Sequence, residues 1–578
     1  MPSADFKAPA SIGSNGPGPH PAATAAGPVE LPEWRVPTET GYVVGSNLVG
    51  VQNSQVSPFK IIVIGAGAAG IDFLHHSVEA FSDLNVSVRC FDKNPDVGGT
   101  CGSQEIWEYM KGIVMDEKLD RSITLSTEVV KAVWNESTST WTVSLASTDG
   151  SRQWEEECNV FLNGTGFVNA WKWPDIEGYD IKGKRVAVIG SGSSGVQTVA
   201  TLYDEVSKLY TWVRSPTWIT AGFAQKYAGK NGANFEYTQE QKEQWRQDPE
   251  QYRQYRKLIE DEVNQRFKVI LRNTAESQEA NEFSYKEMTT KPGNDPRLVE
   301  KIVPKNFNVG CRRPTPGNGY LEALAGEKTT TFTETIHSIT PNGFRDQAGN
   351  EYEVDVIICA TGFDTSYRPR FPVIGLNGTV LTDRWSKLPE SYIGVAAPQM
   401  PNYFMFTGPF TPVAQGAILP IITHMSNYFI QVVRKMCQQH IRRISPKESV
   451  IAEFMEHCRA YLPRTCWADP CPSWFKQKQG KPDGPLVMWP GSRLAFFEAV
   501  KAPNWEDYDI AYWSQNRFGF LGNGFARWEF TADSGTTPYL DGDFVQAVPR
   551  KQVQEMIKQE QEAKGLIKNG VKANGNKL

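Results

Sequence analysis

The sequence holds few residues that could cross-link the chain or bind a metal. It has nine cysteines and seven histidines among 578 residues. An odd and sparse set of cysteines argues against a secreted fold built on disulfides. No CxxC or HxxxH pair occurs, so we expect no structural zinc site and assign no metal ligands. The N-terminus lacks a charged stretch followed by an apolar one, and we therefore expect a reduced, cytoplasmic protein.

Long apolar runs and an excess of one charge are also missing. No run approaches the roughly 18 apolar residues of a membrane-spanning helix, so we expect no membrane span. The net charge is −5 at pH 7 and no strongly basic block occurs, which argues against a nucleic-acid partner. Hydrophobic residues make up 40% and charged residues 22%, which is ordinary globular composition. The length suits about two to four domains.

A glycine-rich turn follows an apolar run of strand length at residues 59–64. It has the GxGxxG pattern, with Gly65, Gly67 and Gly70. The first glycine allows a tight turn, the second lets the backbone approach a pyrophosphate, and the third lets the helix pack on the strand. The next predicted strand ends at Asp92, where an acid can bind ribose hydroxyls. A chance glycine-rich turn is the alternative, but strand, spacing, helix and acid together favour a dinucleotide site.

A second glycine-rich turn follows this acid. It consists of Gly98, Gly99 and Thr100. A glycine pair just after the ribose acid is typical of FAD-binding proteins with two dinucleotide domains, and it lets the backbone run close to the cofactor. We therefore assign FAD to the first domain.

A second GxGxxG motif follows an apolar run at 185–189 and comprises Gly190, Gly192 and Gly195. Its next strand ends in Arg214 rather than in an acid. A guanidinium can pair with a 2′-phosphate, which an acid would repel, so the motif favours NADPH over NADH. The alternative is that Arg214 merely ends a surface strand.

Two short turns flank the second motif. Gly164-Thr165-Gly166 and Ala360-Thr361-Gly362 each end an apolar strand. We interpret them as places where the chain crosses between the two dinucleotide domains, and we assign Thr361 and Gly362 to cofactor binding. The predicted fold class is α/β, with two Rossmann-like domains, a helical insertion and an α/irregular C-terminal region. The predicted division is a flexible arm (1–57), an FAD-binding domain in two parts (58–178 and 351–430), an NADP-binding domain (179–350) with a helical insertion (236–300), and a C-terminal region (431–578).

This order of motifs resembles the class B flavin-dependent monooxygenases, and within them it is similar to the fungal Baeyer–Villiger monooxygenases. The resemblance covers about residues 40–550 and includes the C-terminal pieces at 401–404, 473–476 and 489–492. It implies that NADPH reduces FAD, and that the reduced flavin and O2 insert one oxygen atom into a ketone to give an ester or lactone. It also implies a role in fungal secondary metabolism, as polyketide or terpenoid tailoring.

The family places an arginine after the helical insertion, and the matching segment here carries Arg312 and Arg313. The resemblance implies that Arg313 stabilises the peroxide anion and that Arg312 contacts NADPH. A buried cation suits this chemistry because it stabilises developing negative charge. The alternative is a solvated surface pair.

The sequence departs from the family in two places. The aspartate-bearing loop that should follow Thr100 is absent, since the chain runs within a few residues into Glu105. The FxGxxxHxxxW fingerprint is also absent, because no histidine lies between Gly166 and Gly190. A misplacement of about 1 Å can cost on the order of 100-fold in rate. An uncoupled or inactive cofactor-binding flavoprotein is therefore the alternative function.

A disulfide reductase shares the two-domain layout, and Gly99-Thr100-Cys101 is similar to the start of its redox motif. That family needs a second cysteine at the position of Ile106. Cys466 and Cys471 have CxxxxC spacing but lie far along the chain, so a thiol couple at the flavin is not expected.

Overall fold

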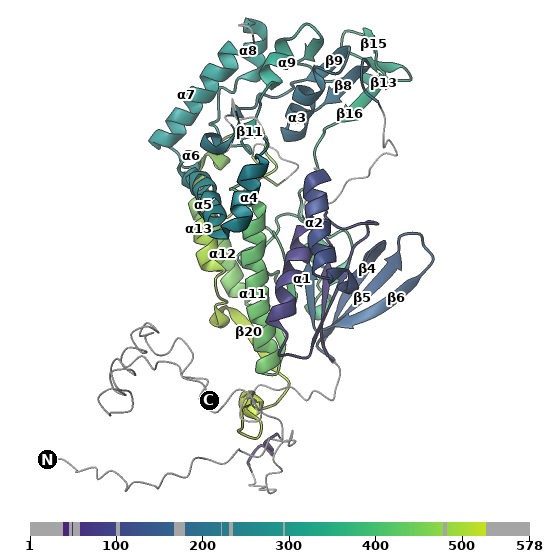
Figure 1. The fold of residues 1–578 in the computed structure, drawn as a ribbon. Helices are drawn as coiled ribbons and strands as arrows, with labels where there is room; N and C mark the ends of the chain where they lie inside the picture. The colour runs from purple at the N-terminus through teal and green to yellow at the C-terminus, as the bar shows by residue number, and fades with distance from the viewer. Residues whose placement is uncertain are drawn as a thin grey trace, which may run out of the picture. The chain divides into compact units, whose positions relative to one another are not determined.

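The computed structural model describes most of the chain (Figure 1). The described residues are 38–45, 49, 58–99, 104–166, 180–220, 222, 224–229, 235–292, 295–477 and 483–526. Most of the predicted arm, Thr100 and residues 527–578 of the predicted C-terminal region lie outside the described residues. Contacts group the chain into two compact units, and one of them, formed by residues 54–437 and 441–513, contains both dinucleotide sheets. In the other unit, Val49 pairs with Ala526.

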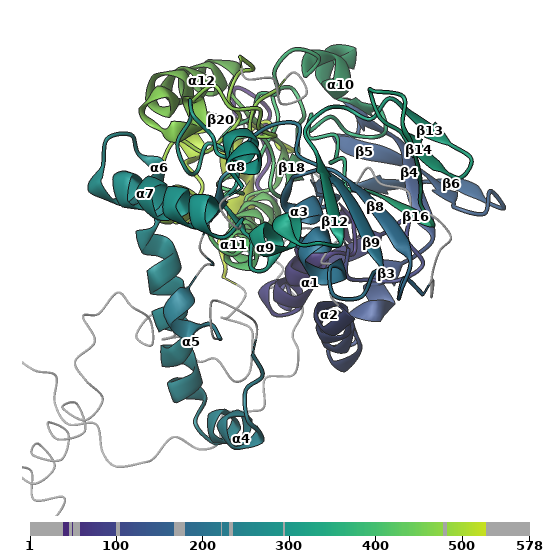
Figure 2. The ribbon, with the colours of Figure 1, turned by 90° about the horizontal axis from the view of Figure 1, so that it is seen from above.

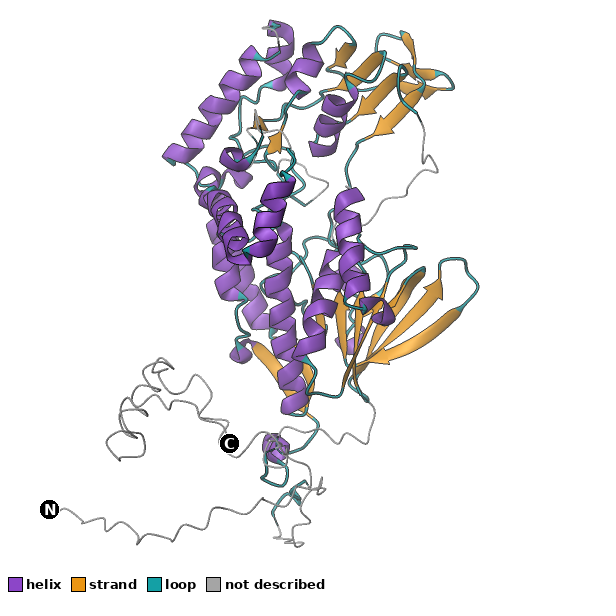
Figure 3. Ribbon diagram, in the orientation of Figure 1, coloured by secondary structure: helices purple, strands orange, loops and turns teal. Residues whose placement is uncertain are grey.

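The first glycine-rich turn belongs to a five-stranded parallel sheet with strand order β18-β7-β1-β2-β3. Figure 3 draws the strands of the described residues in orange. Its strands are β1 (Phe59–Ile64), β2 (Val86–Phe91), β3 (Ile123–Thr124), β7 (Val160–Asn163) and β18 (Tyr403–Met405). The predicted strand at 59–64 is therefore confirmed. Because successive side chains of a strand point to opposite faces, β1 contributes to two cores. Ile61 and Val63 belong to one and Ile62 and Ile64 to the other.

Each face of this sheet is covered by a different kind of layer. The helices whose side chains share the core of Ile61 and Val63 are α1 (Ala68–Ala80), α2 (Gln104–Asp116) and α11 (Ile418–Gln438). The strands that form the sheet over the other core are β4 (Thr127–Asn135), β5 (Thr140–Ser147), β6 (Gln153–Cys158) and β17 (Val373–Ile374). The apolar run of β1 is explained by this burial on both faces.

The second GxGxxG turn lies in a four-stranded parallel sheet with order β12-β9-β8-β16. Its strands are β8 (Arg185–Ile189), β9 (Lys208–Trp212), β12 (Thr329–Phe332) and β16 (Val356–Cys359). One face packs on helices α3 (Ser193–Leu202) and α9 (Tyr320–Ala325). The other packs on an antiparallel sheet of β13 (Ser338–Thr340), β14 (Gly343–Arg345) and β15 (Glu351–Glu353). The predicted α/β fold class is confirmed.

Strand β16 lies in the second sheet, although residues 351–430 are predicted to belong to the FAD-binding domain. Its residues pair in register with β8, for example Val356 with Val186. The strand is apolar and ends in a turn like that of β7, so the local sequence does not reveal its partner. The other boundaries of the domain division stay predictions.

The insertion between the strands of the second sheet is helical, as predicted. Its helices are α4 (Gln239–Gln247), α5 (Pro249–Gln265), α6 (Phe267–Ile270), α7 (Ala275–Thr290) and α8 (Pro296–Ile302). Thr238 and Gln241 form a capping box at the start of α4, and Asp248 caps α5 just before Pro249. Figure 2 shows α4 at the end of α5, and neither helix has a buried residue.

The same unit contains further short strands and helices. They are β10 (Ile219–Thr220), β11 (Thr315–Pro316), α10 (Leu381–Arg384), β19 (Ile441–Pro446), α12 (Glu448–Tyr461), α13 (Arg493–Ala499) and β20 (Tyr508–Tyr512). Strand β10 pairs with β11, and β19 pairs with β20. Among the helices that the structure describes, none is both long and apolar enough to cross a membrane.

The structure contains one disulfide among its described residues, which corrects the expectation of a fully reduced chain. It joins Cys311 to Cys471 across a sequence separation of 160, with the Cα atoms 6.3 Å apart. Cys471 is therefore not paired with Cys466, whose thiol is free and buried. The count of cysteines carried no information on this bond because pairing depends on three-dimensional proximity.

Candidate active site

The first glycine-rich turn has a geometry that only glycine can adopt. Gly65 has a positive φ of 104°, and a Cβ on it would lie 2.5 Å from the carbonyl oxygen of Gly164. A Cβ on Gly70 would lie 2.0 Å from the carbonyl oxygen of Gly65. The turn therefore packs strand, helix and the Gly164 turn together without side chains between them.

Asp92 and the glycine pair lie against this turn. The Asp92 carboxylate accepts hydrogen bonds from the Ala66 and Asn94 N–H groups, each at 2.7 Å. Burial raises the pKa of Asp92, and these backbone hydrogen bonds partly offset the effect. The Gly98 N–H donates to the Ala66 carbonyl at 3.0 Å, and Gly67 pairs with Gly98. The five predicted glycines of the first site and Asp92 thus lie together. Thr100 lies outside the described residues.

The second turn repeats this geometry around Ala360. A Cβ on Gly190, whose φ is 130°, would lie 2.1 Å from the Ala360 carbonyl oxygen. A Cβ on Gly195 would lie 1.9 Å from the Gly190 carbonyl oxygen. Around Gly192, by contrast, no atom outside its own chain neighbours lies within 4 Å of a Cβ position, so this position is open. Gly190 and Gly195 thus pack the turn, and Gly192 leaves space for a ligand.

Three further predicted residues follow the carboxyl ends of the second sheet. Thr361 and Gly362 follow β16 after Ala360, and a Cβ on Gly362 would have open space around it. Arg214 is exposed and follows β9. Parallel sheets bind ligands at this edge, so the three residues lie at the expected end of the strands.

The helices that follow the two turns begin without a side-chain cap. Gly67 is the N-cap of α1 and Gly192 is the N-cap of α3, and neither end has a side-chain hydrogen bond to its first turn. Free N–H groups and the positive end of the helix dipole suit phosphate. The residues present therefore fit a dinucleotide at each turn, FAD at the first and NADPH at the second.

Arg312 and Arg313 lie between the helical insertion and α9. Arg312 is half-buried and Arg313 is exposed, and among the described residues no hydrogen bond or ion pair engages either guanidinium. The surrounding protein still lowers the pKa of both side chains by desolvation. Two neighbouring cations without an anion favour binding of a negatively charged group.

A hydrogen bond links this arginine pair to the second turn. The Ser193 hydroxyl, next to Gly192, lies 2.9 Å from the Thr315 hydroxyl, and Thr315 also bonds the Arg313 carbonyl at 3.3 Å. The pair is thus attached to the first turn of α3. The family resemblance implied the arginines, but it did not indicate this link.

The two sites together define a protein that binds two dinucleotides, and known proteins of similar sequence identify its family. No family model matches the chain. The FAD-binding monooxygenase tazF of Aspergillus terreus is 34% identical over 532 residues, covering 83% of this chain and 94% of that protein. The FAD-binding monooxygenase moxY of Dothistroma septosporum is 31% identical, over 85% of this chain and 86% of that protein. A Baeyer–Villiger monooxygenase of Pseudomonas aeruginosa is 28% identical, over 70% of this chain and 77% of that protein.

Solved structures agree on the fold. A closed crystal structure of cyclohexanone monooxygenase superposes with a TM-score of 0.65 at 21% identity, over 79% of this chain and 100% of that chain. An oxidized steroid monooxygenase bound to NADP has a TM-score of 0.62 at 19% identity, over 78% of this chain and 99% of that chain. The chain belongs to the FAD-binding monooxygenases, the class B flavin-dependent family that its motifs predicted, and the FAD and NADPH cofactors are confirmed at the level of this family.

Proposed function

We propose that this enzyme uses NADPH and O2 to insert one oxygen atom into a ketone, giving an ester or lactone, as a tailoring step of fungal polyketide or terpenoid metabolism. The observation that carries the proposal is the pair Arg312 and Arg313, whose guanidiniums form no hydrogen bond or ion pair among the described residues. Their segment is linked to the second dinucleotide turn through the Arg313 carbonyl and Thr315. The names and fungal origins of the relatives in Aspergillus and Dothistroma support the reaction class and its setting.

Each group of residues has a part in this reaction. When bound, FAD would take a hydride from NADPH and activate O2. Asp92 and the first glycine-rich turn would hold its ribose and pyrophosphate. Arg214 and Arg312 would hold the phosphates of NADPH. Arg313 would stabilise the negative charge that develops on oxygen, because its guanidinium is already partly desolvated and has no competing anion among the described residues.

An uncoupled flavoprotein is the second candidate, and the two missing segments favour it. The alignment with the Aspergillus terreus relative is 532 positions long. This chain contributes only 83% of its 578 residues to the alignment, which is fewer than 532. The relative therefore carries residues with no counterpart here, which supports the absence of the aspartate loop and the fingerprint. In this case NADPH would be oxidised without transfer of oxygen to a ketone.

One assay separates the two candidates. The flavin absorbance band of the purified protein is recorded first. NADPH is then added with and without a panel of ketones, and ester product and hydrogen peroxide are measured. Ketone-dependent product supports the monooxygenase. Peroxide release that does not depend on ketone supports the uncoupled form, and a protein without flavin contradicts both.

We expect Arg214→Ala to raise the KM for NADPH about 10- to 100-fold, since a charge-assisted bond to the 2′-phosphate is worth roughly 1.5–3 kcal/mol. The KM for NADH should not change, because NADH lacks this phosphate. Steady-state flavin reduction with each nucleotide measures both values. Lys208→Ala, at the other end of the same strand, is the matched control. An equal rise in the KM for NADPH and for NADH would show that Arg214 does not bind the 2′-phosphate.

A further inference from the structure

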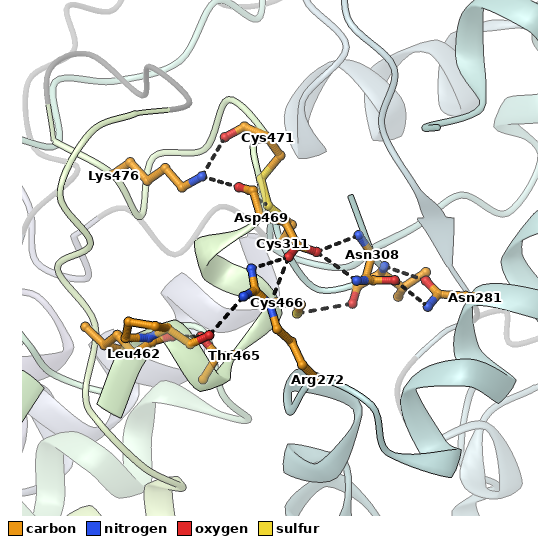
Figure 4. A network of polar contacts seen from close by, with 12 residues as sticks. Arg272, Asn281, Asn308, Cys311, Leu462, Thr465, Cys466, Asp469, Cys471 and Lys476 are labelled. Carbon is orange, nitrogen blue, oxygen red and sulfur yellow. Dashed lines mark hydrogen bonds and ion pairs between the residues drawn. A yellow bond between two sulfur atoms is a disulfide. The ribbon is translucent and has the colours of Figure 1, made fainter. Parts of the chain in front are cut away.

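A buried carboxylate anchors the segment that precedes the arginine pair (Figure 4). Asp469 is 6% exposed. One of its oxygens accepts from the Arg272 Nε and Nη2 groups at 3.1 and 2.6 Å. The other accepts from the backbone N–H and the side-chain amide of Asn308, both at 2.9 Å. Both oxygens of Asp469 are thus engaged, and the chain is fixed at Asn308.

The backbone around Asp469 is held in turn from its other side. Lys476 is 2% exposed, and its ammonium group donates to the carbonyl oxygens of Asp469 and Cys471, the latter at 3.1 Å. Burial lowers the pKa of Lys476. The disulfide ties Cys471 to Cys311, directly before the arginines. Figure 4 shows these groups converging on Asp469.

Helix α7 supplies the remaining attachment. The Asn281 side chain accepts from the Val309 N–H at 2.7 Å and donates to the Asn308 side chain at 2.9 Å. Residues 308–311 are therefore fixed by hydrogen bonds and one covalent bond, and the chain is fixed again at Thr315 in β11. Only three residues, 312–314, span the interval between these anchors, so the anchors determine where the two guanidiniums can reach.

We propose that Asp469 is a positioning residue for the arginine pair. Its carboxylate holds the peptide N–H of Asn308 and so sets the backbone that presents Arg312 and Arg313 to an anionic cofactor. This inference rests on the proposed roles of those two arginines. Arg272 forms an ion pair with Asp469 and orients its carboxylate, while the disulfide is a second link to the same segment. Placement matters at this scale, since a shift of about 1 Å can cost on the order of 100-fold in rate.

The test compares Asp469→Asn with the wild type as full-length, FAD-loaded protein. Asparagine keeps the size and one oxygen acceptor but loses the charge. We expect the Kd for NADP+ to rise about 10-fold or more, as for loss of a charge-assisted bond. Hydrogen exchange of residues 308–314 should become faster, while the flavin content stays at the wild-type level. Asp149→Asn, which changes an exposed aspartate elsewhere, is the matched control.

A second variant covers the case in which Asp469→Asn does not fold. Asn308→Ala keeps the backbone N–H bond to Asp469 but removes the side-chain bonds to Asp469 and Asn281, without removing a charge. We expect a smaller rise in the NADP+ Kd, about 2- to 10-fold. In both variants the KM for NADPH should rise more than kcat falls, because the arginines are displaced and not removed. Wild-type NADP+ affinity and exchange in whichever variant folds would overturn the proposal.

The readouts also separate this inference from the proposed function. If the wild type binds NADP+ but transfers no oxygen to any ketone, the proposed reaction fails while NADP+ affinity and exchange still decide the role of Asp469. If ketone turnover is normal and Asp469→Asn matches the wild type in both readouts, the positioning role fails and the reaction stands.

Discussion

Arg313→Ala is expected to lower ketone-dependent oxygen insertion about 100- to 1,000-fold, the usual cost of removing a group that stabilises developing negative charge. FAD content and anaerobic reduction by NADPH should stay close to wild-type values, because Arg313 is not part of either glycine-rich turn. Product is measured by chromatography, and hydrogen peroxide is measured in the same reaction. Peroxide should account for most of the NADPH consumed by the variant.

Two further variants test whether the charge and the shape of the Arg313 side chain both matter. Arg313→Lys keeps the charge but loses the planar fork, so its product rate should fall between the wild type and the alanine variant. Arg297→Ala, whose side chain is 91% exposed, is a matched control in the same region and should behave as the wild type. An alanine variant that still forms product within a few-fold of the wild type would remove Arg313 from the reaction.

Gly70→Ala is expected to abolish retention of FAD. Its new methyl group would lie 2.0 Å from the Gly65 carbonyl oxygen and 3.3 Å from the Cys90 sulfur, so helix α1 would have to move away from β1. That movement opens the turn on which the pyrophosphate would rest. The measurement is the ratio of flavin to protein after gel filtration, together with the temperature of thermal unfolding.

Alanine at two other glycines gives the controls. Gly112 lies in α2 with open space around a Cβ, so Gly112→Ala should keep FAD and slightly stabilise the helix. Gly192→Ala also meets no neighbour, but it lies in the second turn, so it should keep FAD and weaken NADP+. Full FAD occupancy in Gly70→Ala would contradict the assignment of the first turn.

The features of the site that depend on residues close together in the chain could be predicted from the sequence. Each glycine-rich turn follows an apolar strand directly, and the reasons for glycine at Gly65, Gly70, Gly190 and Gly195 are steric and lie within a few residues or one neighbouring turn. Asp92 was found because it ends the next strand, where its carboxylate caps the first turn. Patterns of this kind repeat over short spans of chain, which is where periodicity carries information.

The features that depend on pairing between residues far apart in the chain could not be predicted from the sequence. Nothing near Val356 shows that β16 pairs with β8 and not with the first sheet. Cys311 and Cys471 have no spacing that marks them as partners, and connectivity cannot be deduced from cysteine positions alone. Asp469 meets Asn308 across 161 residues, so its role in the site became visible only in three dimensions.

The disulfide turns residues 311–471 into a closed covalent ring. Strands β12, β16 and β18 lie inside this ring, while their sheet partners β9, β8 and β7 lie outside it. Each parallel sheet thus contains strands from inside the ring and strands from outside it. A protease that cuts the backbone once within the ring would leave one covalent molecule, which separates into two fragments only after the Cys311–Cys471 bond is reduced.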